Sequence, residues 1–98
     1  MKRDDGRWYT VVSYDVVDDK RRRRMAKVLK GFGDRVQKSV FDCRLEERRL
    51  LDLQGILKNE MNEGEDSVRY YRLCARCVGL VEVVGRGTVM EDEELIII

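Results

Sequence analysis

Residues 35–45, RVQKSVFDCRL, decide which fold this sequence predicts. They lie between two segments with helical periodicity, and eleven residues can hold either one strand or two short ones. One strand would give the order strand, helix, strand, helix, strand, strand. Two strands would give the βαββαβ order of a ferredoxin-like sandwich, an α+β fold, and we predict this second arrangement. We expect both helices on one face of the sheet, with the other face left for a partner.

The residues before this segment predict a strand and then a helix. Residues 8–14 are rich in β-branched and aromatic side chains, and the strand ends at Asp15. Its alternation places Tyr9, Val11, Ser13 and Asp15 on one face, and Trp8, Thr10, Val12 and Tyr14 on the other. Asp18 or Asp19 can cap the helix, which Gly31 and Gly33 end. Its apolar positions are Met25, Val28, Leu29 and Phe32.

The residues after 35–45 predict a second helix and further strands. Leu50, Leu53, Leu57 and Met61 repeat at helical spacing. Gly55 lies inside this helix at a cost of about 1 kcal/mol relative to Ala. We expect strands at 66–73 and 79–84, separated by a turn at 74–78.

The C-terminal tail ends in four aliphatic residues, Leu95 to Ile98, after an acidic run. Burying such a side chain stabilises a fold by about 1.5 to 3 kcal/mol, so we predict an added strand at a sheet edge. That edge can belong to the same chain or to a partner subunit, and the glycines at 85 and 87 favour exchange within a homodimer. We therefore divide the chain into a ferredoxin-like domain, 1–85, and a tail, 86–98.

The charge distribution predicts a polyanion as partner. The chain has 98 residues, enough for one domain, and a net charge of +1. That value averages unlike regions, because seven basic and no acidic residues lie between Lys20 and Gly33, whereas acids outnumber bases from Asp42 to Asp66. A local basic pole steers nucleic acid. The start MKRDDGRWYT lacks a secretory segment, no stretch reaches membrane-spanning length, and three cysteines make no disulfide framework, so we expect a cytoplasmic protein without a membrane partner.

Asp15 is the candidate metal ligand. Mg²⁺ prefers oxygen ligands, and Asp15 from two symmetry-related chains could hold one hydrated ion that activates water on a phosphodiester. The alternative is a strand-end aspartate that bonds to the following turn. The chain has no histidine, so any general base is a carboxylate, Tyr, Lys or metal-bound hydroxide.

The basic helix offers two groups of side chains. Helical spacing places Arg23, Lys27 and Lys30 opposite the apolar stripe, where they can bind backbone phosphates. Arg22 and Arg24 flank the stripe. The alternative is a solvated face paired with Asp18 and Asp19.

These residues carry a resemblance. SYDVVDDKRRRRMAKVLKGFGDRVQKSVF, residues 13–41, resembles the signature region of the CRISPR-associated protein two family, and the similarity runs from Tyr9 to Val84 through DSVRYYRLC and VEVVGRG. The resemblance implies a homodimeric DNA-binding scaffold that acts with the CRISPR-associated integrase in spacer acquisition. It also implies Mg²⁺-dependent endonuclease activity on RNA or duplex DNA, as in some members. By position, Asp15 is similar to the family's metal-binding aspartate. The positions associated with activity in some members are Tyr14, Arg22, Arg24, Arg35, Ser39 and Phe41.

Two features depart from the family pattern, the acidic and aliphatic tail and the C-A-R-C at Cys74 and Cys77. One CxxC is a weak zinc signal, because structural zinc wants four ligands and only Cys43 remains, although two pairs could meet across a dimer. The simpler interpretation is a turn with two small buried thiols. The sequence thus leaves two functional hypotheses, a Mg²⁺-dependent phosphodiesterase and a scaffold without catalysis. An RNA-binding module of the same sandwich would show an aromatic, glycine-rich signature that this chain lacks.

Overall fold

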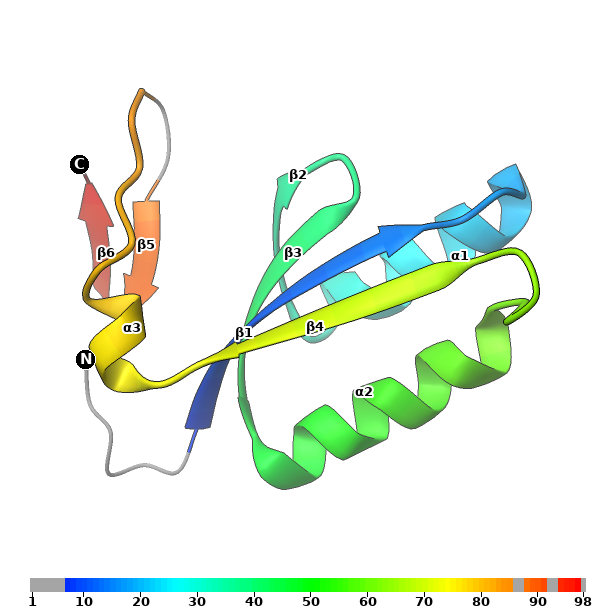
Figure 1. Ribbon diagram of the computed structural model, residues 1–98, viewed down its shortest axis with the longest axis horizontal. Helices are drawn as coiled ribbons and strands as arrows, with labels where there is room; N and C mark the ends of the chain where they lie inside the picture. The colour runs from blue at the N-terminus through cyan, green and yellow to red at the C-terminus, as the bar shows by residue number, and fades with distance from the viewer. Residues whose placement is uncertain (1–6, 86–87, 92–93, 98) are drawn as a thin grey trace.

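The computed structural model describes residues 7–85, 88–91 and 94–97. Its elements follow one another along the chain with two strands between the long helices (Figure 1). They are β1 (Arg7–Asp15), α1 (Asp19–Lys30), β2 (Gly33–Gln37), β3 (Val40–Glu46), α2 (Glu47–Glu60), β4 (Ser67–Leu73), α3 (Ala75–Val78), β5 (Thr88–Glu91) and β6 (Glu94–Ile97).

The segment 35–45 bends into two strands, as predicted. Lys38 and Ser39 form the turn between β2 and β3, and Gln37 pairs with Val40. The register shifts between Arg35 and Gln37, so β2 carries an irregularity just before the turn. The four-stranded sheet has the order β2-β3-β1-β4, and each neighbouring pair is antiparallel. This order confirms the ferredoxin-like sandwich.

Helices α1 and α2 cover one face of this sheet (Figure 1). The core beneath them contains the even-numbered residues of β1, Val12 and Tyr14, which are both buried. The apolar helix positions join them: Met25, Leu29, Leu50, Leu53 and Leu57. Tyr9 lies on the other face in a smaller cluster, so the predicted alternation of β1 is confirmed.

Local signals set the limits of α1. The Asp18 carboxylate accepts the backbone N–H of Arg21 at 2.9 Å and so caps the helix, as expected. The C-cap is Gly31, whereas Gly33 already opens β2. A Cβ on Gly33 would lie 2.3 Å from the Asp42 carbonyl oxygen, so the close approach of β2 to β3 requires glycine here.

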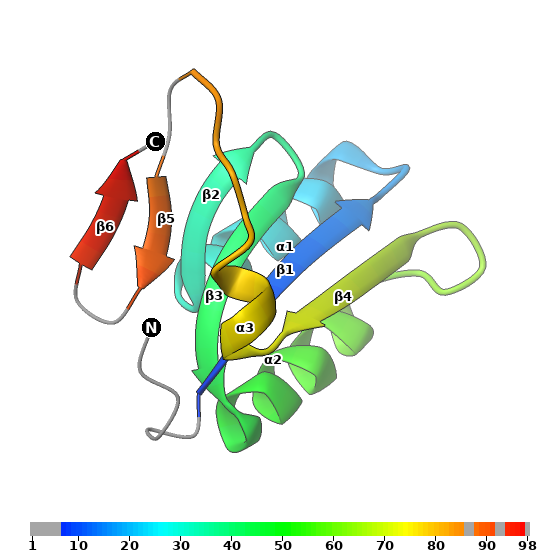
Figure 2. The ribbon, with the colours of Figure 1, turned by 60° about the vertical axis from the view of Figure 1, so that its left-hand side comes forward.

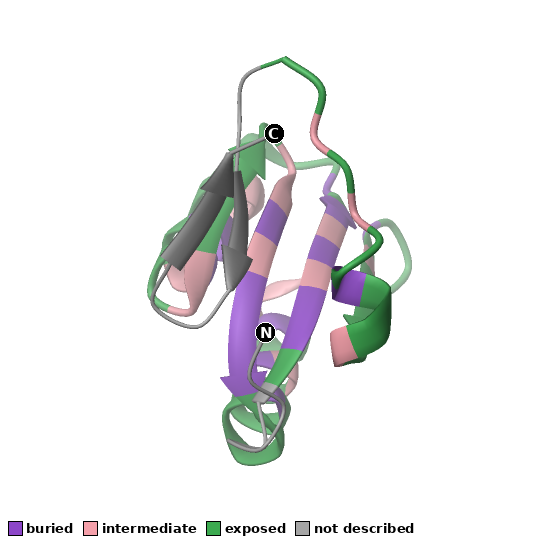
Figure 3. Cartoon of the chain, turned by 90° about the vertical axis from the view of Figure 1, so that its left-hand side faces the viewer, coloured by how far each residue is buried: buried purple, intermediate pink, exposed green. Residues whose placement is uncertain are grey.

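The prediction of a strand at 79–84 is wrong. The turn expected at 74–78 contains the short helix α3, which directs the chain across the helix-free face of the sheet (Figure 2). Val78, Val81 and Val83 pack there with Tyr9. These residues cover a face instead of running beside an edge, so they form no ladder. Figure 3 shows the resulting contrast between the largely buried central strands and the mainly exposed α3.

The tail forms a strand, but not on the sheet edge of its own domain. β6 pairs with β5 in an antiparallel hairpin, in which Thr88 faces Ile97 and Glu91 faces Glu94. Ile98, the last of the four aliphatic residues, lies outside the described residues. Addition of the tail to a partner subunit stays a prediction.

No helix in the described part of the chain is both long enough and apolar enough to cross a membrane.

Candidate functional site

The register between β1 and β4 builds a small polar cavity on the helix-free face. Ser13 lies opposite Arg69, and Asp15 lies opposite Ser67. Together with Tyr14 these residues line a cavity of about 230 Å³. Directly opposite residues of an antiparallel pair share a face, so four polar side chains meet where β1 ends.

Asp15 is exposed in this cavity, and its carboxylate is free to meet a ligand from solvent. Within the part of the chain that the structure describes, no three His, Cys, Asp or Glu side chains are grouped so that they could hold a metal ion. One carboxylate and two serine hydroxyls supply too few ligands for a hard cation. The donor set therefore fits Mg²⁺ only when waters, phosphate oxygens or a second Asp15 complete it.

Arg69 is a cation at this site that no local sequence pattern indicates. Its guanidinium lines the same cavity as Asp15 and is exposed. A hydrogen bond to the Tyr71 side chain raises the pKa of Arg69, so the guanidinium of Arg69 stays positively charged. The alternation of residues 67–73 places Ser67, Arg69 and Tyr71 on one face, but only the pairing register shows that this face meets Asp15.

The end of β1 is held on its helix side by contacts between Tyr14, Phe41 and the turn residues 38 and 39. The rings of Tyr14 and Phe41 stack with centroids 6.2 Å apart, and both side chains are buried. The Tyr14 hydroxyl donates to the Lys38 carbonyl at 3.3 Å, and the Ser39 carbonyl accepts the Tyr14 backbone N–H at 3.1 Å. This arrangement gives Tyr14, Phe41 and Ser39 a packing role, and Tyr14 and Phe41 face the helix-side core.

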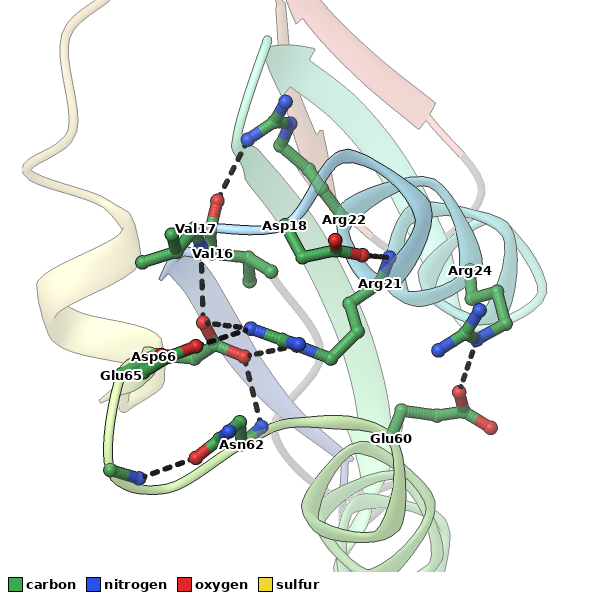
Figure 4. A network of polar contacts seen from close by, with 11 residues as sticks. Val16, Val17, Asp18, Arg21, Arg22, Arg24, Glu60, Asn62, Glu65 and Asp66 are labelled. Carbon is green, nitrogen blue, oxygen red and sulfur yellow. Dashed lines mark hydrogen bonds and ion pairs between the residues drawn. The ribbon is translucent and has the colours of Figure 1, made fainter.

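The three arginines at positions that the resemblance associates with activity, Arg22, Arg24 and Arg35, do not converge on Asp15. Arg22 donates to the Val16 carbonyl at 2.7 Å and forms an ion pair with Asp19. Arg24 donates to Glu60 at 2.9 Å (Figure 4). The guanidinium of Arg35 lies over the Phe41 ring, 5.3 Å from its centre. Arg22 is the one of the three that contacts the residue next to Asp15, because its hydrogen-bond partner Val16 directly follows Asp15 in the chain.

Arg21 and Asp66 hold the connection after Asp15 in place. The Arg21 guanidinium donates from Nε at 2.8 Å and from Nη2 at 3.1 Å to the two Asp66 oxygens (Figure 4). The same carboxylate accepts the backbone N–H groups of Val17 at 3.0 Å and Asn62 at 2.9 Å. The Arg21 hydrogen bonds, followed by these two N–H groups, hold the pKa of Asp66 well below its usual range.

The outer face of α1 carries a basic stripe, which we define as Lys20, Arg23, Lys27 and Lys30. All four are exposed, and they repeat at helical spacing opposite the buried Met25, Ala26 and Leu29. The predicted position of Arg23, Lys27 and Lys30 is therefore confirmed. The stripe faces solvent from the helix layer, whereas Asp15 lies on the opposite face of the sheet, so these are two separate surfaces.

Known proteins of one family are similar to this chain over most of its length. Residues 7–81 match the family model described as CRISPR associated protein Cas2. The chain is 44% identical over 84 residues to a CRISPR-associated endoribonuclease Cas2 of Chloroflexus aurantiacus, covering 86% of this chain and 90% of the relative.

Two solved structures share the fold. Streptococcus pyogenes Cas2 is 34% identical, with a TM-score of 0.70 over 79% of this chain and 99% of that one. A chain of a partial Cas6-RT-Cas1–Cas2 complex is 25% identical, with a TM-score of 0.59 over 79% of this chain and 90% of that one. With the matched fold and the family match over residues 7–81, the chain belongs to the CRISPR-associated protein Cas2 family.

Proposed function

We propose that this chain is a nucleic-acid-binding subunit that acts with the CRISPR-associated integrase in spacer acquisition. Within the family, the observation that carries this proposal is the basic stripe on α1, whose four cations are exposed opposite the core. The solved complex that contains Cas1 and Cas2 supports an integrase as partner. We expect the subunit to work in the cytoplasm, because three cysteines make no disulfide framework.

The stripe suits the phosphate backbone of DNA. From Lys20 to Lys30 it follows about 15 Å of helix axis, at about 1.5 Å per residue. Phosphates of one strand lie about 3.4 Å apart along a duplex, so several can face the stripe. Such contacts position a duplex without reading its sequence.

A homodimer is part of the proposal. The edge of β4 has no neighbouring strand among the described residues of this chain, and the sheet order leaves it at the end of the sheet. An open edge recruits a strand from another chain. A second copy would bring a second Asp15 and a second basic stripe.

The second candidate function is Mg²⁺-dependent cleavage of RNA or duplex DNA. It is favoured by the exposed Asp15 beside Arg69, and the Chloroflexus relative is called an endoribonuclease. Bound Mg²⁺ would lower the pKa of a coordinated water and neutralise charge on a phosphodiester. Asp15 from two chains would hold the ion, and Arg69 would hold the phosphate by charge-assisted hydrogen bonds. The alternative is a scaffold with no catalysis.

One pair of variants separates the two functions. Asp15→Asn keeps the side-chain size but removes the charge that a hard cation needs, so it should abolish metal-dependent cleavage and leave DNA binding intact. Arg69→Gln should weaken cleavage while metal binding persists. Both variants are assayed for cleavage of RNA and of duplex DNA, with and without Mg²⁺. Metal-dependent cleavage by Asp15→Asn at the parental rate would refute the role of Asp15.

A further inference from the structure

The CxxC of α3 is used by neither proposed function. Cys74 is the N-cap of α3 and Cys77 lies in the helix, and both side chains are exposed. The expectation of two buried thiols in a turn is therefore wrong. The turn itself is closed, because the Val78 N–H donates to the Cys74 carbonyl at 3.0 Å. The Cys74 and Cys77 side chains are therefore accessible to solvent on a hydrogen-bonded turn.

The two side chains lie three residues apart on the α3 turn and influence each other's ionisation. The backbone N–H of Cys77 donates to the Cys74 sulfur, and the Cys77 thiol and the Arg76 N–H add further bonds, which together lower the pKa of Cys74. The hydrogen bond between the Cys77 and Cys74 side chains raises the pKa of Cys77. A CxxC pair with this division has one thiol that attacks and one that resolves.

A metal site does not explain the pair within one chain. Structural zinc takes four nitrogen or sulfur ligands, and the whole chain has no histidine. Cys43, the third cysteine, is buried in the helix-side core, whereas α3 packs on the other face of the sheet, and burial raises the pKa of Cys43 to about 12. Cys43 is therefore unreactive in the folded chain and serves as an internal control.

From this geometry we propose that Cys74 and Cys77 form a reversible thiol–disulfide pair that reacts with low-molecular-weight disulfides of the glutathione type. The Cys74 thiolate attacks one sulfur of the small disulfide, forms a mixed disulfide and expels one small thiolate. The Cys77 thiolate then attacks the Cys74 sulfur, forms the Cys74–Cys77 bond and expels the second small thiolate. Two protein thiols are oxidised, and the small disulfide is reduced to two thiols that take up the two protons.

The pair lies where its state can act on the sheet. Val78, the next residue, is buried against Tyr9 on the helix-free face. The Tyr9 hydroxyl donates to Asp42 at 2.6 Å, so α3 rests on a residue that is itself fixed to β3. A bond between Cys74 and Cys77 would lock the turn that holds Val78 on this face.

The test uses the reduced full-length chain, oxidised glutathione, acid quenching and mass spectrometry. Trypsin cleaves after Arg72, Arg76 and Arg86, which places the two cysteines in different peptides. We expect the peptides 73–76 and 77–86 to remain joined until a reductant is added. Cys77→Ser should stop at a mixed disulfide on Cys74. Cys74→Ser should react several-fold more slowly at Cys77, and Cys43→Ala should oxidise like the parent.

Three results would overturn the proposal. One is that both thiols stay reduced in a large excess of oxidised glutathione with no added reductant. Another is a linkage between chains, detected by mixing isotope-labelled and unlabelled protein. The third is stoichiometric zinc in the purified chain, with both thiols protected from alkylation until a chelator is added.

Discussion

The Arg21 guanidinium donates two hydrogen bonds, of 2.8 and 3.1 Å, to the Asp66 carboxylate, and so connects the first turn of α1 to the residue before β4. The four consecutive arginines at 21–24 therefore do different work. Arg21 is structural, Arg22 and Arg24 have protein partners, and Arg23 is exposed in the basic stripe. A charge run that looks uniform in sequence divides by the helical direction of each side chain.

Asp66→Asn should destabilise the fold more than Glu65→Gln does. Glu65 also bonds Arg21, at 3.2 Å, but it is exposed, whereas the Asp66 side chain is buried. The pKa of Asp66 is lowered in the folded state. The Asp66 charge therefore stabilises the fold fully above the unfolded-state pKa of about 3.9, and this stabilisation is lost as the pH falls towards and through the pKa of the folded state. Thermal unfolding from pH 7 to pH 2 should show the gap between parent and Asp66→Asn closing at acid pH. A constant gap would contradict this linkage.

Arg23→Glu with Lys27→Glu should weaken nucleic-acid binding on every sequence. Each lost phosphate contact lowers the slope of log K against log salt by about 0.9, so the double variant should lose up to about 1.8. Arg48→Glu with Lys58→Glu is the matched control, because both residues are exposed on α2 and the charge change is equal. Fluorescence anisotropy over a salt series measures both variants. Equal losses in the two would mean that net charge, not the stripe, drives binding.

Tyr14→Phe should leave cleavage and binding unchanged. The hydroxyl donates a hydrogen bond to the Lys38 carbonyl at 3.3 Å, and loss of this bond should cost about 1 kcal/mol or less. Phe41→Ala should cost about 3 to 5 kcal/mol, because this side chain is fully buried. Urea unfolding gives both values. If Tyr14→Phe abolishes cleavage while its stability stays parental, Tyr14 takes part in the chemistry and its packing role is incomplete.

Deletion of residues 95–98 should shift the proposed homodimer towards monomer. It removes most of β6 and leaves the backbone of β5 without its partner. Sedimentation velocity at several concentrations measures the shift, and circular dichroism verifies that the domain of residues 7–85 still folds. A dimer of parental strength would show that the tail has no part in association.

Much of the fold followed from local pattern. The alternation of β1, the apolar stripes of α1 and α2 and the Asp18 cap are each set by neighbouring residues, so the sequence predicted them. The two strands in 35–45 followed because only they complete a ferredoxin-like sheet. The segment 79–84 misled, because Val81 and Val83 alternate as in a strand but pack across the sheet face.

The site was harder to predict than the fold. Asp15 was a candidate from its place at a strand end together with the family resemblance. Helical spacing predicted the outward position of Arg23, Lys27 and Lys30, and the structure adds Lys20 to this stripe. Arg69 and Ser67 were missed, because their proximity to Asp15 depends on the register between β1 and β4. Arg21 and Asp66 are 45 residues apart, so no local pattern pairs them.

Spacer integration reconstituted with a Cas1-type integrase tests the central claim most directly. The parent, Asp15→Asn, Arg23→Glu with Lys27→Glu and the α2 control would be compared at equal integrase binding. We predict that integration fails in the α1 double variant and proceeds at the parental rate in Asp15→Asn and in the control. Parental integration by the α1 double variant, or integration that does not require this chain, would contradict its role as the nucleic-acid-binding subunit.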